Sequence, residues 1–214
     1  KYNRSEVYNK KIKNLSKVIS GIGFEETKTL PTIVGLCEVE NKNVVEDLIN
    51  SDLLKNANYG ISHFDSPDER GIDVALIYRK NMFKILNENS AYLELKYASG
   101  KINYTRDQLV VEGVLENENI YIIVNHWPSR SGGELGSRPY RNKAAELNMF
   151  IIDSIQSINK NAKIITMGDF NDDPTNESIK KILGAKDSRN NLKNSDLYNP
   201  WENLFKSGVG TLVY

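Results

Sequence analysis

The sequence has very few residues that bind soft metal ions. It contains one cysteine, Cys37, and two histidines, His63 and His126, among 214 residues. One cysteine excludes an intramolecular disulfide and a cysteine-based zinc cluster, and two histidines exclude a three-histidine metal site. Any metal site must therefore be built mainly from oxygen ligands. We expect Cys37 to be a small buried core residue and His63 to be a surface or structural residue.

The sequence also lacks an excess of charge of either sign. Lys and Arg together number 28, as do Asp and Glu, so the formal net charge is zero. A protein that holds long nucleic acid through its overall charge is usually strongly basic, so nucleic-acid contacts here would need local clusters. No stretch approaches the ~20 consecutive apolar residues of a transmembrane segment. With 39% hydrophobic and 26% charged residues, the composition is that of an ordinary globular protein.

The hydrophobic pattern predicts one α/β domain over residues 1–214. Helices are expected at 6–22, 43–54, 137–158 and 177–183. Strands are expected at 32–39, 59–64, 72–78, 82–85, 92–97, 108–115, 120–125 and 163–167. This order suits two largely antiparallel sheets packed on each other, with helices outside. The final run, 210–214, looks like a strand or turn that is cut short.

Polar residues able to perform chemistry follow three of the apolar runs. Glu38 follows the first run, Asn125 and His126 follow the second, and a Gly-Asp-Phe-Asn sequence at 168–171 follows the third. A carboxylate at such a strand end costs free energy unless it is hydrogen-bonded or holds a cation. If the three ends meet, they offer hard oxygen ligands for Mg²⁺, an imidazole donor and a carboxylate that positions water.

Four motifs resemble those of the endonuclease/exonuclease/phosphatase superfamily and occur in the order typical of that family. They are a metal-binding strand, a core hairpin strand, a histidine motif and the Gly-Asp-Phe-Asn motif, at 33–41, 70–79, 125–133 and 168–172. One such motif arises by chance, whereas four in order are specific. The resemblance implies a four-layer α/β/β/α sandwich that cleaves phosphate esters with Mg²⁺ or Mn²⁺.

The resemblance also implies roles for individual residues. Glu38 matches the family's metal-binding glutamate, and Asp169 matches the aspartate that orients or deprotonates the attacking water. His126 matches a histidine that donates to a phosphate oxygen or acts as a general acid. Asn171 matches an amide that binds near the scissile phosphate. The structural alternatives are a salt bridge for Glu38, a hydrogen-bonded core position for His126, and a turn stabilised by Asp169 and Asn171.

A further set of residues is expected to line the phosphate pocket. By resemblance, Tyr78 lies at its rim or floor and is counted with the catalytic residues. The residues expected to bind substrate are Arg70, Asn125, Arg130, Arg138 and Arg141. The last three flank a glycine-rich loop, where their guanidinium groups would clamp phosphate; a solvated helix face is the alternative. Arg106 resembles the start of a family strand, and its role is left open.

Two parts of the family pattern are absent from the sequence. The family normally opens with a strand that ends in an asparagine near the metal, and it closes with an aspartate and an Asp-His pair on a final strand. We expect the native chain to extend beyond the given sequence, past Tyr214 for the closing strand, and to hold these residues there; a degraded site is the alternative. The compartment stays open, because a secretory leader removed with the missing start is a further alternative.

These observations predict a monomeric, metal-dependent phosphodiesterase, most specifically a nuclease with nucleic acid as its substrate. A phosphatase or lipid phosphodiesterase on the same scaffold is the first alternative, because a fold does not determine the substrate. A non-catalytic binding module with a degraded site is the second.

Overall fold

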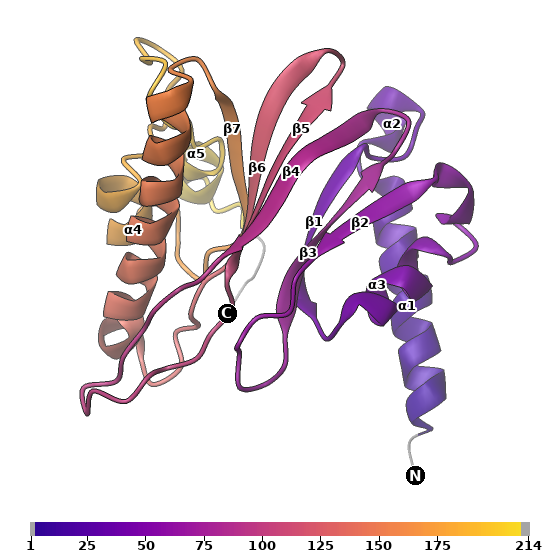
Figure 1. Ribbon diagram of the computed structural model, residues 1–214, viewed down its shortest axis with the longest axis horizontal. Helices are drawn as coiled ribbons and strands as arrows, with labels where there is room; N and C mark the ends of the chain where they lie inside the picture. Colours follow the sequence, from indigo (N-terminus) through magenta and orange to yellow (C-terminus); the bar gives the residue numbers. More distant parts are fainter. Residues whose placement is uncertain (1–2, 211–214) are drawn as a thin grey trace.

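The computed structural model describes residues 3–210, in which two sheets pack face to face between outer helices (Figure 1). The first sheet has the order β1-β3-β2 and is antiparallel throughout. Its strands are β1 (Ile33–Val39), β2 (Tyr59–His63) and β3 (Asp73–Arg79). The second sheet has the order β4-β5-β6-β7 and is antiparallel except for the β6–β7 pair. Its strands are β4 (Phe83–Ala91), β5 (Gln108–Leu115), β6 (Glu118–His126) and β7 (Lys163–Asp169).

Helices cover the outer faces of the two sheets (Figure 1). The first sheet carries α1 (Arg4–Gly21), α2 (Phe24–Thr27), α3 (Lys42–Ile49) and the 3₁₀ helix η1 (Lys55–Ala57). The second carries α4 (Glu134–Ile158), the π-helical turn η2 (Ser178–Ile182) and α5 (Trp201–Lys206). The predicted four-layer α/β/β/α sandwich is therefore confirmed. Most of the terminal run expected at 210–214 lies outside the described residues.

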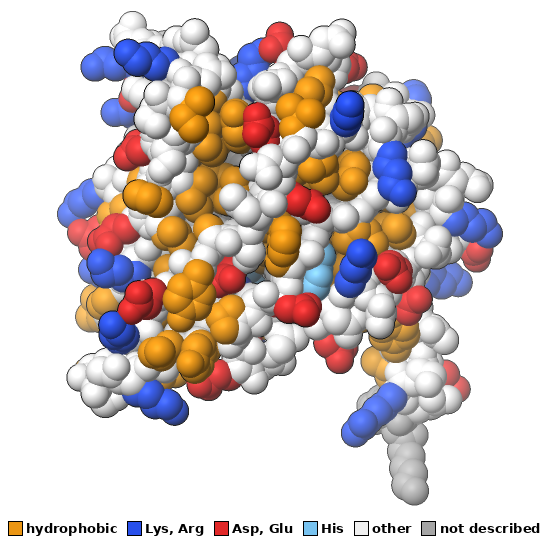
Figure 2. Space-filling model, viewed as in Figure 1, with side chains coloured by type: hydrophobic (Ala, Val, Ile, Leu, Met, Phe, Trp, Pro, Cys, Tyr) orange, Lys and Arg blue, Asp and Glu red, His pale blue; other side chains and the backbone are white. Residues whose placement is uncertain are grey.

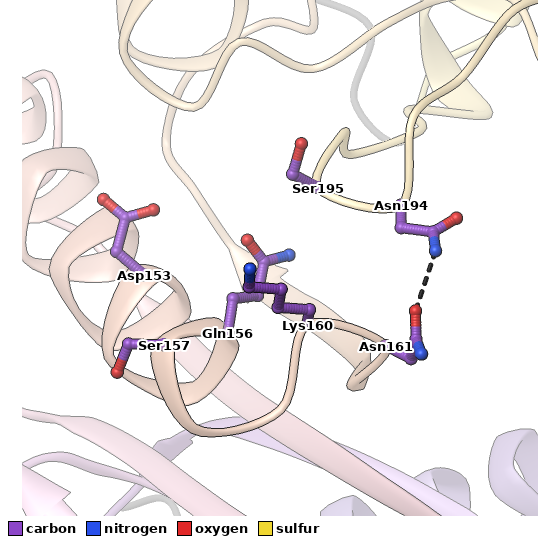
Figure 3. A pocket seen from close by; sticks show the side chains of 7 residues that line it. All are labelled: Asp153, Gln156, Ser157, Lys160, Asn161, Asn194 and Ser195. Carbon is purple, nitrogen blue, oxygen red and sulfur yellow. Dashed lines mark hydrogen bonds between the residues drawn. The ribbon is translucent and has the colours of Figure 1, made fainter.

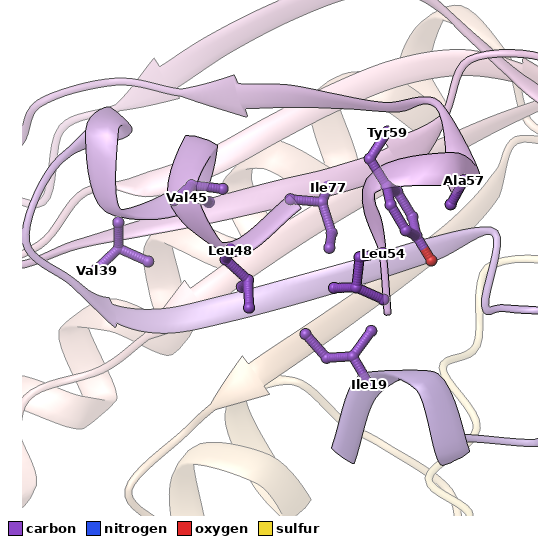
Figure 4. Packing of buried hydrophobic residues seen from close by; sticks show 9 residues of the cluster. Ile19, Val39, Val45, Leu48, Leu54, Ala57, Tyr59 and Ile77 are labelled. Carbon is purple, nitrogen blue, oxygen red and sulfur yellow. The ribbon is translucent and has the colours of Figure 1, made fainter. Parts of the chain in front are cut away.

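Three buried clusters hold the four layers together. The alternation of side chains along a strand explains how β3 serves two of them. Ile77 (Figure 4) and Ala75 face the helices of the first sheet, whereas Val74 and Leu76 face the second sheet. The third cluster lies between the second sheet and α4 and contains the fully buried Trp127.

The surface matches the balanced charge of the sequence. Figure 2 shows Lys and Arg side chains interspersed with Asp and Glu over the visible face, with no large area of one sign. Among the described residues, no helix is long and apolar enough to span a membrane.

The structure corrects several predicted boundaries. The segment at 92–97 is not a sheet strand; it contributes only a single bridge, between Lys96 and Ile102. The strand predicted at 82–85 continues to Ala91, and the helix predicted at 43–54 ends at Ile49. The helix predicted at 177–183 is a π-helical turn. Short polar segments such as 86–91 lack an apolar face, so their pairing depends on the neighbouring strand β5.

Three strands of the second sheet end at the same end of the sandwich. β4 and β6 are both antiparallel to β5, and β7 is parallel to β6. Their carboxyl ends therefore lie together, as Figure 1 also shows, and the polar residues after β6 and β7 are brought to one place.

Candidate active site

Glu38, His126 and Asp169 meet where β1, β6 and β7 end. The Nε2 atom of His126 lies 3.4 Å from Glu38 Oε1 and 3.9 Å from Asp169 Oδ2. The side chains of Glu38 and Asp169 are 55% and 54% exposed, whereas that of His126 is 4% exposed. Two solvent-facing carboxylates therefore flank one buried imidazole where the three strands end.

Glu38 occupies a β-bulge. The β1–β3 register shifts by one residue between Leu36 and Val39, and Glu38 has φ 58°, in the left-handed region. That conformation costs a non-glycine residue about 1 kcal/mol. Cys37 directly precedes Glu38, and its Sγ donates to the carbonyl oxygen of Asn125 (3.2 Å). Burial raises the pKa of the Cys37 thiol to about 11, consistent with a structural rather than a reactive cysteine.

Asp169 and Asn171 form a tight turn that also orients the asparagine amide. The backbone N–H of Asn171 donates to Asp169 Oδ1 (2.9 Å), and its Nδ2 donates to the carbonyl oxygen of Trp127 (2.9 Å). Asn171 has φ 50°. Because the amide nitrogen is held by Trp127, the amide oxygen is left for a ligand. A turn at Asp169 and Asn171 is thus compatible with the proposed roles of these two residues at the phosphate.

Gly168 allows this turn to approach β6 closely. It has φ 129°, and a Cβ atom there would collide with the carbonyl oxygen of Asn125. Glycine is therefore required at the position directly before Asp169.

A buried ion pair lies beneath the cluster. Arg106 donates to Asp68 Oδ2 (3.1 Å) and to the carbonyl oxygen of Trp127 (2.6 Å). Both Arg106 and Asp68 are buried. Sequence reasoning left Arg106 open and missed Asp68, which precedes the 70–79 motif and was marked only by a turn-forming Ser-Pro-Asp sequence.

Arg70 lies at the rim of the cluster. Its guanidinium group is 3.7 Å from Glu38 Oε1 and 3.6 Å from Asp68 Oδ1, and its side chain is more than half exposed. The backbone N–H of Arg70 also donates to Asp68 Oδ1 (2.9 Å). Asp68 therefore positions two arginines, one buried and one facing solvent.

His126 is held in its neutral form by its surroundings. Burial is the main cause of its lowered pKa, and the positive charge of Arg106 adds to it, while Asp169 and Glu38 act in the opposite direction. Nδ1 of His126 is buried and has no hydrogen-bond partner among the described residues. A neutral imidazole whose Nε2 faces two carboxylates is suited to donate a hydrogen bond from that atom.

Three arginines that were predicted to bind phosphate form ion pairs within the protein instead. Arg141 is fully buried and donates from Nε to Asp172 Oδ1 (2.6 Å), which corrects its assignment as a substrate contact. Arg130 is partly exposed and pairs with Asp173 at 2.9 Å. Arg138, also partly exposed, makes two bonds to Glu134 within the first turns of α4. These ion pairs shape the loop that follows His126.

Two other predicted residues do not reach the cluster. Asn125 is fully buried; its amide oxygen accepts hydrogen bonds from Trp127 Nε1 and Asn148 Nδ2, both at 2.9 Å. Tyr78 pairs with Ile33, at the opposite end of β1 from Glu38, and its ring packs edge-on against Phe83. Asn125 therefore anchors α4 to the sheet, and Tyr78 is a packing residue.

A second group of possible metal ligands lies at the edge of the first sheet. Ligand atoms of His63, Asp65 and Asp73 are within 4.8 Å of one another. His63 Nε2 lies 3.1 Å from Asp73 Oδ2, while Asp73 Oδ1 accepts hydrogen bonds from the N–H and hydroxyl of Ser66. These bonds close the 64–72 loop and fit the structural role expected for His63.

A polar hollow lies at the far end of β7 (Figure 3). It is lined by the end of α4 and the 194–195 segment, with a hydrogen bond from Asn194 to Asn161 (2.8 Å). Asn161 lies just before Lys163, the first residue of β7, whereas Asp169 is the last. With about 3.3 Å per strand residue, the hollow is about 20 Å from the cluster and plays no part in it.

Comparisons with known proteins agree with this architecture. Residues 1–214 match the Endonuclease/Exonuclease/phosphatase family, and the chain belongs to that family. No curated protein matches the sequence.

Solved structures with the same fold are distant in sequence. D. rerio TDP2 complexed with single-strand DNA product is 15% identical, with a TM-score of 0.52 over 78% of this chain and 56% of that one. The human Nocturnin catalytic domain with bound sulfate anion is 20% identical, with a TM-score of 0.53 over 78% and 60%. ANGEL2, a 2',3'-cyclic phosphatase, is 17% identical, with a TM-score of 0.57 over 80% and 46%. This chain therefore spans less than two thirds of each neighbour.

Proposed function

We propose that the protein hydrolyses phosphate esters with a divalent metal ion and acts mainly as a nuclease. The observation that carries the proposal is that Glu38, His126 and Asp169 meet at three strand ends. A carboxylate oxygen of Glu38 and one of Asp169 lie within 4 Å of His126 Nε2. Family membership supports a hydrolase of this class. A fold neighbour bound to a single-strand DNA product supports nucleic acid as the substrate.

The residues of the cluster fit Mg²⁺ or Mn²⁺. Glu38 and Asp169 offer half-exposed carboxylate oxygens, and Asn171 adds an amide oxygen that no described residue binds. Mg²⁺ prefers oxygen donors and retains several waters, so few protein ligands suffice. Glu38 would hold the ion, with Asp169 and Asn171 beside it. When bound, the ion would stabilise the charge that develops on the phosphate.

The other roles follow from the positions of the side chains. Asp169 has one oxygen fixed by Asn171 and a second free to accept a proton from the attacking water. Neutral His126 would donate from Nε2 to a phosphate oxygen, and Arg70 would neutralise a phosphate at the rim. We further expect the protein to act as a monomer.

The test compares Glu38→Gln with Glu40→Gln, which removes an exposed charge two residues away. Nicking of supercoiled plasmid and calorimetric binding of Mn²⁺ are measured for both. We expect Glu38→Gln to lose at least about 100-fold in rate and its Mn²⁺ heat, because the replacement removes the negative charge that holds the ion, while Glu40→Gln keeps both.

Equal behaviour of the two variants would refute the role of Glu38. The protein could bind the metal without nicking plasmid. Turnover of small phosphate monoesters in that case would favour the phosphatase alternative, and turnover of phospholipids would favour the lipid phosphodiesterase alternative. Absence of Glu38-dependent heat would favour a non-catalytic binding module.

A further inference from the structure

A short hairpin, which we call the aromatic hairpin, extends between β4 and β5 at residues 92–104. Its arms are joined by the Lys96–Ile102 bridge and by a hydrogen bond from Tyr97 N–H to the carbonyl oxygen of Lys101 (2.9 Å). It projects from the end of the sandwich at which β4, β6 and β7 terminate (Figure 1). The hairpin is therefore an ordered element beside the candidate active site.

The two faces of the aromatic hairpin differ in burial. Leu93 and Leu95 are buried in the cluster that contains Trp127, so the inner face is fixed to the protein. The exposed residues of its two arms alternate with buried or half-buried ones. On the outer face they are Tyr92, Glu94, Lys96, Ile102 and Tyr104, whereas Tyr97 and Lys101 are exposed at the tip on the face of Leu93 and Leu95. The fold therefore supports a solvent-facing surface rich in aromatic rings.

Three tyrosines of the aromatic hairpin are not used by the fold. Tyr92, Tyr97 and Tyr104 are 47%, 40% and 42% exposed, and their hydroxyls make no hydrogen bond to any residue in 3–210. Tyr59, in contrast, is buried and donates to the carbonyl oxygen of Pro31 (2.6 Å). Figure 2 shows hydrophobic side chains gathered at the lower left, where Figure 1 draws this hairpin. Both the ring faces and the hydroxyls are available to a ligand.

The base of the aromatic hairpin is tied to the candidate active site. Arg106 follows Tyr104 by two residues, which span at most about 7 Å of chain. Its guanidinium donates to the carbonyl oxygen of Trp127 (2.6 Å), the residue directly after His126. On the other arm, the N–H of Leu93 donates to Asp107 (3.4 Å). Tyr92 and Tyr104 therefore flank the part of the hairpin that meets the site.

The charge of the aromatic hairpin suits a polyanion. Lys96 pairs with Glu94 at 2.8 Å, whereas Lys101 forms no ion pair within the described part of the chain. One positive charge thus remains at the tip, among exposed rings. Aromatic side chains with nearby cationic groups bind single strands, because every base has a face that stacks on a ring.

We propose that the aromatic hairpin binds unpaired bases of single-stranded nucleic acid beside the scissile phosphate, an inference that rests on the proposed hydrolysis of phosphodiesters. Tyr92 and Tyr104, which share the outer face of the hairpin, would stack on successive bases, and Lys101 at the tip would neutralise a backbone phosphate. Duplex DNA keeps its bases stacked on one another, so it cannot use these rings. The hairpin would then select single-stranded over duplex substrate.

The test uses Tyr104→Ala and Tyr92→Ala, with Tyr104→Phe as the variant that keeps the ring. Phe150→Ala, at a highly exposed position on α4, controls for the loss of a surface aromatic. Binding of a single-stranded 12-mer and of its duplex is followed by fluorescence anisotropy, and KM is measured for the 12-mer and for bis(p-nitrophenyl) phosphate.

We expect each alanine variant to bind the single strand about 5- to 100-fold more weakly, as for loss of one stacked base. Binding of the duplex and KM for the small diester should be unchanged, and Tyr104→Phe and Phe150→Ala should resemble the wild type. Wild-type affinity of both alanine variants for the single strand would overturn the inference, as would equal losses with the duplex.

Two other results identify a different partner and also overturn the inference. In the first, the alanine variants lose binding to phosphatidylserine vesicles but keep binding to the single strand. In the second, the alanine variants change their oligomeric state. Because anisotropy needs no turnover, absence of hydrolysis by the wild type refutes the proposed function alone.

Discussion

Arg141 is predicted to stabilise the fold without contacting substrate. Its side chain is 0% exposed, and its Nε lies 2.6 Å from Asp172 Oδ1, on a side chain that is 1% exposed. Removing one partner of a buried ion pair costs about 3–5 kcal/mol, because the other charge is left uncompensated. Arg130 remains 3.5 Å from the same oxygen, which places Arg141→Ala near the lower figure. A loss of about 3 kcal/mol corresponds to a fall in Tm of about 6–12 °C at this chain length.

The matched control is Arg138→Ala, one turn earlier on the same helix. Arg138 pairs with the partly exposed Glu134 at an i,i+4 spacing, which contributes about 0.3–0.5 kcal/mol. Urea unfolding gives both free energies, and activity is measured well below the lower Tm. We expect only Arg141→Ala to lose stability, with its remaining folded fraction fully active. Wild-type stability with lost activity would refute the structural role and restore Arg141 as a phosphate contact.

Two further changes test the backbone and the charge around the site. Gly168→Ala should cost at least about 2 kcal/mol in urea unfolding, because the added Cβ strikes the carbonyl oxygen of Asn125; a neutral effect would contradict the close approach of β6 and β7. Burial raises the pKa of Asp107 above its ordinary value of 3.8. The stability that protonated Asp107 contributes is therefore fully present below about pH 3.8, and it is lost as the pH rises through the folded-state pKa. Asp107→Asn should therefore gain stability relative to the wild type between about pH 4 and pH 7; a loss over that interval would show that the ionised form is favoured.

The sequence was informative wherever apolar periodicity and motif position coincide. The strands before Glu38, His126 and Asp169 are continuous apolar runs, so both the strands and the polar residues after them could be predicted. The 92–97 segment alternates like a strand, but its backbone pairs only with the short second arm of its own hairpin and not with a strand of either sheet. Alternation alone does not reveal whether a second strand is present.

The site residues that sequence reasoning misplaced are those whose partners lie far along the chain. Arg141 pairs with Asp172, and Asn125 binds Asn148, contacts that no local pattern encodes. Arginines near a glycine-rich loop resemble phosphate ligands whether or not they are buried. Asp68 was missed because its partner Arg106 is 38 residues away. Burial and pairing of such charges become visible only in three dimensions.

The bulge at Glu38 implies that the fold would be more stable without its candidate ligand residue. A glycine at this position would adopt the left-handed backbone without strain. Selection for heat resistance alone should therefore enrich substitutions at this position, whereas selection for turnover should retain the glutamate. A library screened separately under each pressure would separate residues kept for chemistry from residues kept for folding.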